Sequence, residues 1–197
     1  TLSLHDALPI FTPATYVERC VIDAIKHDIT IYAAHTNMDV VANGVSGRMA
    51  DKLDLHHRQI LQPEGDPVAG NGFGIIGELL QPVESMAFLQ QVKEIFRCDR
   101  LRYTTPHTSS IQRVAVCGGA GASFFKQALA GQADIYISGD FKYHDFFLTE
   151  NRIMIADIGH YESEQFTKEI FYEILTKKIS KFAVQFSEIN TNPIKYL

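Results

Sequence analysis

The chain has 197 residues, with 18 Lys and Arg against 23 Asp and Glu, which gives a formal charge of −5 with His neutral. This balance excludes a generally basic surface, so we expect no general nucleic-acid binding. Hydrophobic residues make up 46% and charged residues 21%, which excludes a disordered or fibrous chain and leaves a globular one with a sizeable core.

The cysteines Cys20, Cys98 and Cys117 are an odd count at wide spacings without a CxxC motif. This usage favours a reducing compartment, and we expect a cytoplasmic protein. Cys20 and Cys117 fall on apolar faces and are predicted to be core residues. No stretch approaches the ~20 apolar residues of a membrane span, so we expect no membrane insertion.

The first ten residues follow neither a helical nor a strand period, and residues 1–10 are predicted to be a leader that is not native to the protein. From Tyr16, apolar residues recur at the spacing of an amphipathic helix. The β-branched run Ile29–Ala34 predicts a strand covered on both faces. A polar run follows at 35–39, and a helix is predicted from near Asn43. The inward face of that helix carries Val45, Met49 and Leu53.

Glycines and prolines gather in residues 62–74, which marks a joint in the chain. We therefore predict that residues 11–74 are the remnant of a first α/β lobe and that residues 75–197 form a second, with approximate boundaries and lobes free to interleave. A helix with a regular apolar stripe is predicted to begin near Ser85, a suitable N-cap residue.

The last ninety residues alternate between short apolar runs and helical patterns. The predicted strands are Arg113–Cys117, Ile135–Ser138, Ile153–Ile158 and Phe182–Ile189, and the predicted helices run from Ser123, over Tyr143–Leu148 and over Glu162–Lys178. This alternation is typical of an α/β fold with a largely parallel sheet. In such sheets, ligand sites gather beyond the carboxyl ends of the strands.

His160 and Glu164 follow one of these strands and open the longest predicted helix. Residues four apart share a helical face, so the imidazole and the carboxylate can converge on one cation. The spacing alone favours a simpler interpretation, in which His160 packs at the strand end while Glu162 and Glu164 stabilise the helix N-terminus through its dipole. Asp39, at the end of the polar run 35–39, is a third candidate that could equally cap the helix near Asn43.

Other polar segments are weaker candidates. Gly118–Gly121 could cradle an anion with bare amides, or could simply be a tight turn. Asp140–Asp145 includes His144, which could move protons near neutral pH, or the segment could cap a helix. The pair His56–His57 is best explained as a solvated turn. The absence of a GxSxG motif from the sequence gives no indication of a hydrolase serine.

Taken together and in order, the segments HTNMD, NGV, GNGFGIIGEL, VAVCGGAGAS, ADIYISGDFKYHD, IADIGHYESE and NTNPIKYL resemble the Nif-three-like family. Its members are also described as dinuclear metal-centre proteins or GTP cyclohydrolase 1 type 2 homologues. The resemblance covers about residues 16–197. It implies the Nif-three-like fold of two linked α/β lobes, with mixed sheets flanked by helices.

The resemblance also implies a ring-shaped homohexamer with two divalent metal ions in each site. The Asp of HTNMD corresponds to Asp39, and the His and second Glu of GHYESE correspond to His160 and Glu164. The metal identity stays open among Zn, Mn, Fe, Co and Ni. His35 and His144 have no assigned role. The family has a His-His-Pro segment before its first helix, and nothing equivalent stands there in this chain, so three of five family ligands are matched.

Two functions follow as hypotheses from this resemblance. The first is a metal-dependent, hydrolase-like protein that activates water against a phosphorylated or heterocyclic small molecule. The second is a non-catalytic metal-binding protein with a regulatory or metal-delivery role. The same ligands serve both, so the sequence does not separate them.

Overall fold

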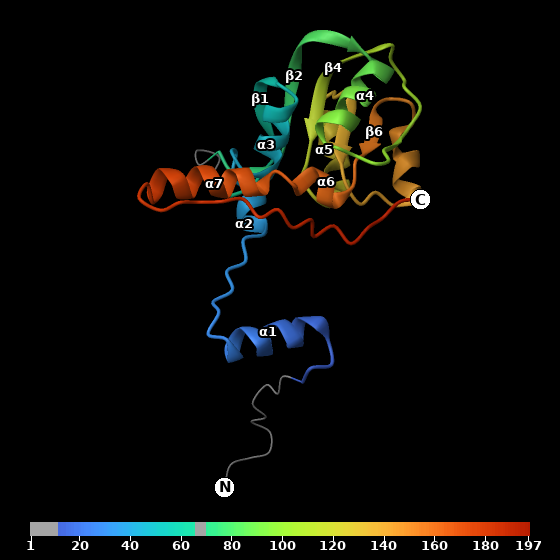
Figure 1. The fold of residues 1–197 in the computed structure, drawn as a ribbon. Helices are drawn as coiled ribbons and strands as arrows, with labels where there is room; N and C mark the ends of the chain where they lie inside the picture. Colours follow the sequence, from blue (N-terminus) through green and yellow to red (C-terminus); the bar gives the residue numbers. More distant parts are fainter. Residues whose placement is uncertain (1–11, 66–69) are drawn as a thin grey trace. The chain divides into compact units, whose positions relative to one another are not determined.

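The structure is a computed structural model that describes residues 12–65 and 70–197 (Figure 1). The chain divides into two compact units, one up to His35 and one over Thr36–Leu197, and each is described here by itself. The predicted leader at residues 1–10 lies outside the described residues. Within the described part, no helix is long and apolar enough to cross a membrane.

The first unit contains one helix, α1 (Tyr16–Lys26). Thr15 caps it, because its hydroxyl accepts a hydrogen bond from the Glu18 N–H and the Glu18 carboxylate accepts one from the Thr15 N–H. The prediction that Cys20 is a core residue is wrong, since its side chain is exposed on α1. The predicted strand Ile29–Ala34 is also wrong. This run forms neither helix nor strand, because no second strand of the unit's described residues pairs with it.

The second unit is built on one mixed sheet with the strand order β1-β2-β4-β5-β6-β3. The strands are β1 (His56–Pro63), β2 (Gly72–Glu84), β3 (Arg102–Tyr103), β4 (Ser110–Val116), β5 (Ile135–Ser138) and β6 (Met154–Asp157). The helices are α2 (Thr36–Asp39), α3 (Val45–Lys52), α4 (Ser85–Ile95), α5 (Phe125–Ala130), α6 (His160–Glu164) and α7 (Thr167–Lys178), with 3-10 turns η2 (Ala122–Phe124) and η3 (Tyr143–Thr149). The α/β class with a mixed sheet flanked by helices is thus confirmed.

The sheet is less parallel than its pattern predicted. Only β4, β5 and β6 run parallel to one another, while β1, β2 and β3 pair antiparallel with their neighbours. The stretch 62–74, predicted as a joint, lies between β1 and β2 of this one sheet, and its residues 66–69 are outside the described part. Two glycines there, Gly72 and Gly74, have a packing role. A side chain on Gly74, at φ +70°, would come within 2.9 Å of the Val116 carbonyl oxygen.

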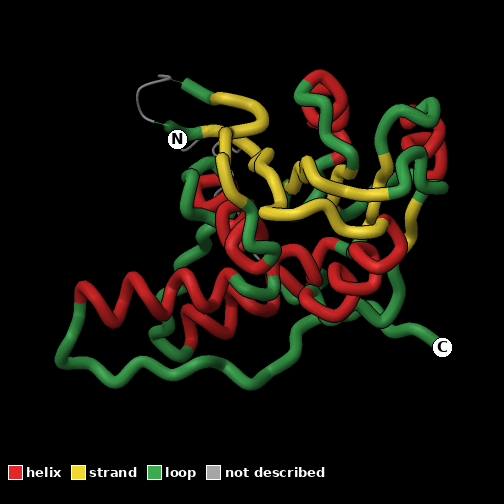
Figure 2. Tube along the Cα trace, turned by 90° about the horizontal axis from the view of Figure 1, so that it is seen from above, coloured by secondary structure: helices red, strands yellow, loops and turns green. Residues whose placement is uncertain are grey.

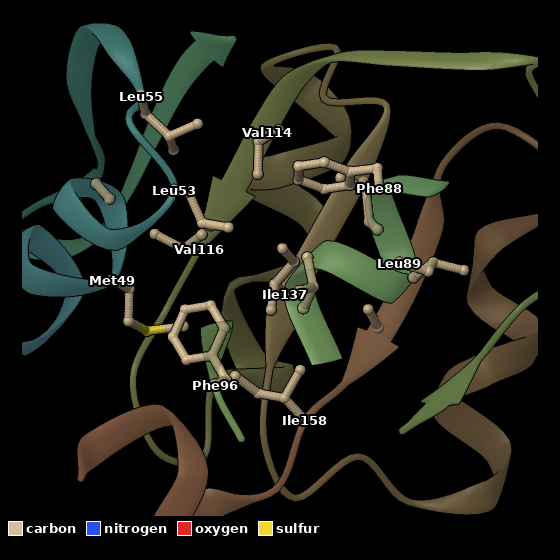
Figure 3. Packing of buried hydrophobic residues seen from close by; sticks show 14 of the residues in the cluster. Met49, Leu53, Leu55, Phe88, Leu89, Phe96, Val114, Val116, Ile137 and Ile158 are labelled. Atoms are coloured by element: carbon tan, nitrogen blue, oxygen red, sulfur yellow. The ribbon is translucent and has the colours of Figure 1, made fainter. Parts of the chain in front are cut away.

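Both faces of the central strands are buried, and Figure 2 shows helices on either side of the sheet. On one face, Val114 and Val116 of β4 and Met154 and Ala156 of β6 share a buried cluster with residues of α3 and α4. On the other face, Ala115 and Ile155 share a cluster with Phe125 and Ala128 of α5. Figure 3 shows the cluster between the sheet and the helices α3 and α4, in which Val114, Val116 and Ile137 of the strands lie in one core with Met49 and Phe88 of the helices. Strands covered on both sides need near-continuous apolar runs, which is why β4, β5 and β6 were recognisable in the sequence.

Two predictions fail toward the C-terminus. The long helix predicted over Glu162–Lys178 is divided into α6 and α7. The predicted strand Phe182–Ile189 forms neither strand nor helix, because no neighbouring strand in the described chain pairs with it. An apolar residue of this segment packs against a helix instead: the Phe186 ring stacks on the Tyr172 ring of α7, with 4.6 Å between the ring centroids.

Candidate functional site

Three parallel strands of the second unit end at one edge of the sheet, and each is followed by a polar turn. The register pairs Val116 of β4 with Ile137 of β5, and Ser138 of β5 with Asp157 of β6. The turns after β4, β5 and β6 therefore lie next to one another, at the place where α/β sheets form their ligand sites.

His160 is held in place by the turn that precedes it. Ile158 is buried in the core and its N–H donates to the Ser138 carbonyl oxygen at 3.0 Å. Gly159 then adopts φ +91°, a conformation that glycine adopts readily, and its N–H donates to Asp157 Oδ1 at 3.0 Å. This sharp turn places His160 as the first residue of α6, with its side chain partly exposed.

Asp140 binds one nitrogen of this imidazole. His160 Nδ1 lies 2.7 Å from Asp140 Oδ2, a normal hydrogen-bond distance. Asp140 adopts φ +59°, and Gly139 before it packs so closely on α6 that a side chain there would come within 2.8 Å of the His160 backbone nitrogen. The turn after β5 is thus fitted to His160. The sequence pattern did not single out Asp140 as its partner.

Glu164 faces the other imidazole nitrogen. Its Oε1 lies 3.4 Å from His160 Nε2, so the predicted pairing of residues one helical turn apart is present on α6. Gly119, at φ +64°, leaves the space that this carboxylate fills, because a side chain there would come within 2.5 Å of Glu164 Oε1. Glu162 points elsewhere and accepts a hydrogen bond from the Asn192 amide at 3.1 Å.

The surroundings raise the pKa of His160. Burial opposes protonation of the ring, but the hydrogen bond to Asp140 and the negative charges of Glu164, Asp140 and Asp39 outweigh it. Asp39, the last residue of α2, is therefore close enough to act electrostatically on the imidazole. It does not cap the next helix, since α3 has Gly44 as its N-cap and no side-chain cap bond.

The three predicted ligands do not form a complete metal cluster. Within residues 12–65 and 70–197, no group of three or more His, Cys, Asp and Glu side chains is placed to hold a metal ion. The structure brings His160 and Glu164 together, and the negative charge of Asp39 acts on the imidazole. An imidazole nitrogen beside a carboxylate oxygen matches the donors that divalent transition metals take, so this pair fits part of a site.

The glycine turn after β4 is not an anion cradle. The N–H groups of Gly118, Gly119 and Gly121 donate to serine hydroxyl oxygens at 3.2, 2.8 and 3.0 Å. The serines are Ser46, Ser163 and Ser138, and all three are buried. The tight-turn explanation therefore holds. These serines come from distant parts of the chain, and no local motif marks them.

The remaining candidates belong to other elements of the chain. Asp145 stabilises the start of η3, where its carboxylate accepts from the Lys142 N–H at 2.7 Å. His144 is exposed on η3 with its ring 5.4 Å from that of Tyr143, and His35 belongs to the first compact unit. His56 and His57 begin β1 at an irregularity in its pairing rather than forming a separate turn.

Cys117 lies next to the site but has no reactive thiol. Burial raises the pKa of this thiol to about 11, so it stays protonated at neutral pH. Burial also raises the pKa of the Cys98 thiol, to about 12. Neither cysteine is suited to nucleophilic chemistry, and the prediction that Cys117 is a core residue is confirmed.

Known proteins resemble the chain in both sequence and structure. A protein of Streptococcus pneumoniae described as "GTP cyclohydrolase 1 type 2 homolog" is 36% identical over 184 residues, which cover 89% of this chain and 68% of the relative. The crystal structure of the Staphylococcus aureus hypothetical protein SA1388 matches with a TM-score of 0.84 at 24% identity, covering 98% of this chain and 76% of the other. A Bacillus cereus protein related to NIF3 matches with a TM-score of 0.82 at 20% identity, covering 98% and 81%.

The two structural matches are below 25% identity and show the fold alone. The sequence comparisons go further, because the pattern of one family, Duf34/NIF3 (NGG1p interacting factor 3), matches residues 6–193. That match spans nearly the whole chain and includes all of the segments on which the resemblance was based except the end of the last one, NTNPIKYL. The chain therefore belongs to the Duf34/NIF3 family.

Proposed function

We propose that the chain binds two divalent metal ions through Asp39, His160 and Glu164 and acts in a hydrolase-like manner on a small molecule. The observation that carries the proposal is the arrangement of His160, with one nitrogen bound to Asp140 at 2.7 Å and the other facing Glu164 at 3.4 Å. A carboxylate behind a histidine is the usual companion of a metal-ligating imidazole.

The roles of the side chains follow from this arrangement. In the neutral imidazole, Asp140 accepts the hydrogen bond of Nδ1–H, which leaves the lone pair of Nε2 directed toward Glu164. Glu164 contributes a carboxylate oxygen, and Asp39 would complete the set with a second carboxylate. A bound divalent ion would supply a Lewis acid and lower the pKa of a coordinated water.

The substrate class is also a proposal. The relatives named GTP cyclohydrolase 1 type 2 homolog point toward hydrolysis of a heterocycle or of a phosphorylated small molecule. We extend that class to this chain without choosing a substrate. The homohexameric ring and the cytoplasmic location implied at the sequence level remain part of the same proposal, and the mass of the assembly by light scattering tests the ring.

Metal uptake provides the first test, through two matched variants of α6. Glu164→Gln removes a carboxylate beside His160, whereas Glu162→Gln removes one that points toward Asn192. We expect at least about a tenfold loss of affinity for Zn²⁺ or Mn²⁺ in Glu164→Gln and little change in Glu162→Gln. Elemental analysis after equilibrium dialysis measures both, and equal metal content in the two variants would contradict the assignment.

Turnover provides the second test. The chain, loaded with manganese, zinc or iron, is incubated with a panel of nucleotides, and products are separated by chromatography. We expect a metal-dependent product that Asp39→Ala abolishes. Stoichiometric metal uptake without any product across the panel would instead support the non-catalytic metal-binding role.

A further inference from the structure

The segment that follows α7 runs back along the helices of the candidate site, as Figure 1 shows. It is tied to α6 by Asn192, whose side-chain amide donates a hydrogen bond to Glu162 Oε1 at 3.1 Å. Residues 190–194, with the sequence NTNPI, therefore lie beside the helix that carries two of the candidate metal ligands. The proposed metal chemistry gives this motif no role.

Two hydrogen bonds from side chain to backbone fix the bend of this motif. Asn190 Oδ1 accepts from the Asn192 N–H at 2.9 Å, and Asn192 Oδ1 accepts from the Ile194 N–H at 3.1 Å. Both are Asx turns, and Pro193 adds a fixed φ angle to the second one. Asn192 thus uses both ends of its amide: the oxygen shapes its own segment, and the nitrogen binds the buried Glu162.

The bend places Pro193 and Ile194 in the wall of a cavity of about 460 Å³, which is also lined by His160 and Glu164. This volume is within the range of small-molecule sites. Ile194 is 53% exposed, so its apolar surface is available to a ligand. The remaining lining side chains are all uncharged, namely Tyr161, Gln165, Thr167 and Asn192.

This lining favours one kind of chemical group. Beyond the two candidate ligands and a metal ion that they would hold, nothing in the wall compensates the charge of a phosphate, and burying an uncompensated charge is costly. An uncharged flat ring, in contrast, gains free energy from the apolar area that it buries against Pro193 and Ile194.

We propose that Pro193 and Ile194 bind the flat face of an uncharged heterocyclic ring of the ligand, and that Asn192 is the positioning residue that holds this wall beside α6. The inference rests on the proposed function, whose substrate class includes heterocycles and phosphorylated molecules, and it selects the heterocycle for this cavity. Because His160 and Glu164 line the same cavity, a ring bound there lies next to the candidate metal ligands.

The first experiment titrates inosine, and separately ribose-5-phosphate, into the chain without added metal, and follows the isoleucine methyl signals by NMR. Inosine carries an uncharged ring without a phosphate, and ribose-5-phosphate carries a phosphate without the ring. We expect a saturable shift of the Ile194 methyl signal with inosine and none with ribose-5-phosphate. Ile194→Ala should weaken inosine binding at least about fivefold, because it removes apolar area from the wall.

Ile179→Ala is the matched control for the wall. Ile179 is 50% exposed, close to the 53% of Ile194, but it does not line the cavity, so inosine binding should not change. The proposal is overturned by the absence of a saturable Ile194 shift with inosine, by an equal shift with ribose-5-phosphate, or by equal weakening in the two alanine variants.

The positioning role is tested from the other end of the tether. Glu162 does not line the cavity, but Glu162→Ala removes the acceptor of the Asn192 amide and should weaken inosine binding as Asn192→Ala does. Glu162→Gln keeps an acceptor oxygen and should bind inosine as the parent protein does. Equal binding by the two Glu162 variants would rule out this role for Asn192.

Ring binding and metal uptake can fail separately, because the inosine titration is done without metal. Inosine binding in a chain that takes up no metal would count against the proposed function and leave the ring site standing. Metal uptake without an Ile194 shift would do the reverse.

Discussion

At the scale of single residues, the site depends on the two carboxylates that contact His160: Asp140 at Nδ1 and Glu164 at Nε2. The spacing of His160 and Glu164 predicted one of these contacts, because residues four apart on a helix are always neighbours. The contact with Asp140 was not predictable from spacing. It arises because β5 and β6 are adjacent and in register, which brings the turn after β5 to the start of α6.

Asp140→Asn tests the role of this second carboxylate. Asparagine also tolerates the left-handed backbone that Asp140 adopts, so the melting temperature should change little. Metal affinity should fall by about 10- to 100-fold, since an amide supports the imidazole less well than a carboxylate does. Calorimetric titration with Zn²⁺ measures the affinity. The control Asp145→Asn, which alters only the start of η3, should bind metal as the parent protein does, and unchanged affinity in Asp140→Asn would argue against the orienting role.

At the scale of elements, the buried central strands were predictable and the outer ones were not. β4, β5 and β6 are covered on both faces, so their sequences are continuous apolar runs. β1 and β2 were hidden by the glycines and prolines between and within them, which suggested a joint. At residues 29–34 and 182–189, by contrast, the sequence predicted strands that the structure does not contain. Both segments have a strand-like pattern, but no neighbouring strand in the described chain pairs with them, and local composition cannot predict a pairing partner.

Gly119→Ala tests how closely the glycine turn is fitted to α6. Both Gly119 and Gly65 have positive φ angles, of +64° and +70°, so alanine at either should cost about 1 kcal/mol of stability through the backbone. Only at Gly119 would the new methyl group meet Glu164, whereas nothing lies within 4 Å at Gly65. We therefore expect similar losses of stability by denaturant unfolding, and weaker metal binding in Gly119→Ala alone. Equal metal affinity in the two variants would show that Glu164 relaxes without consequence.

At the scale of the whole molecule, the chain combines a well-packed body with extended segments. Residues 27–35 and 179–197 contain neither helix nor strand, although parts of the second segment contact α6 and α7. Backbone without regular hydrogen bonds opens easily, and proteases need an extended substrate. Exposure alone should therefore not decide where the chain is cut.

Limited digestion with chymotrypsin checks this expectation. Tyr32, Phe182 and Tyr143 are similarly exposed, at 77%, 69% and 71%, but only Tyr143 lies within a helical turn, η3. We expect the first cuts after Tyr32 and Phe182, with cleavage after Tyr143 at least about tenfold slower. Mass spectrometry over a time course identifies the fragments. Early cleavage at Tyr143 would mean that η3 opens as readily as the extended segments.

The position of the His160 ring between two carboxylates has a further consequence. Its two nitrogens belong to one conjugated system, so a change in the contact between Nδ1 and Asp140 alters how strongly the opposite nitrogen donates its electrons. Thermodynamic reciprocity then requires that a cation held beside Glu164 change the strength of the Asp140 contact by the same factor. A single aromatic ring would in this way couple the backbone turn after β5 to whatever is bound on the opposite side of the imidazole.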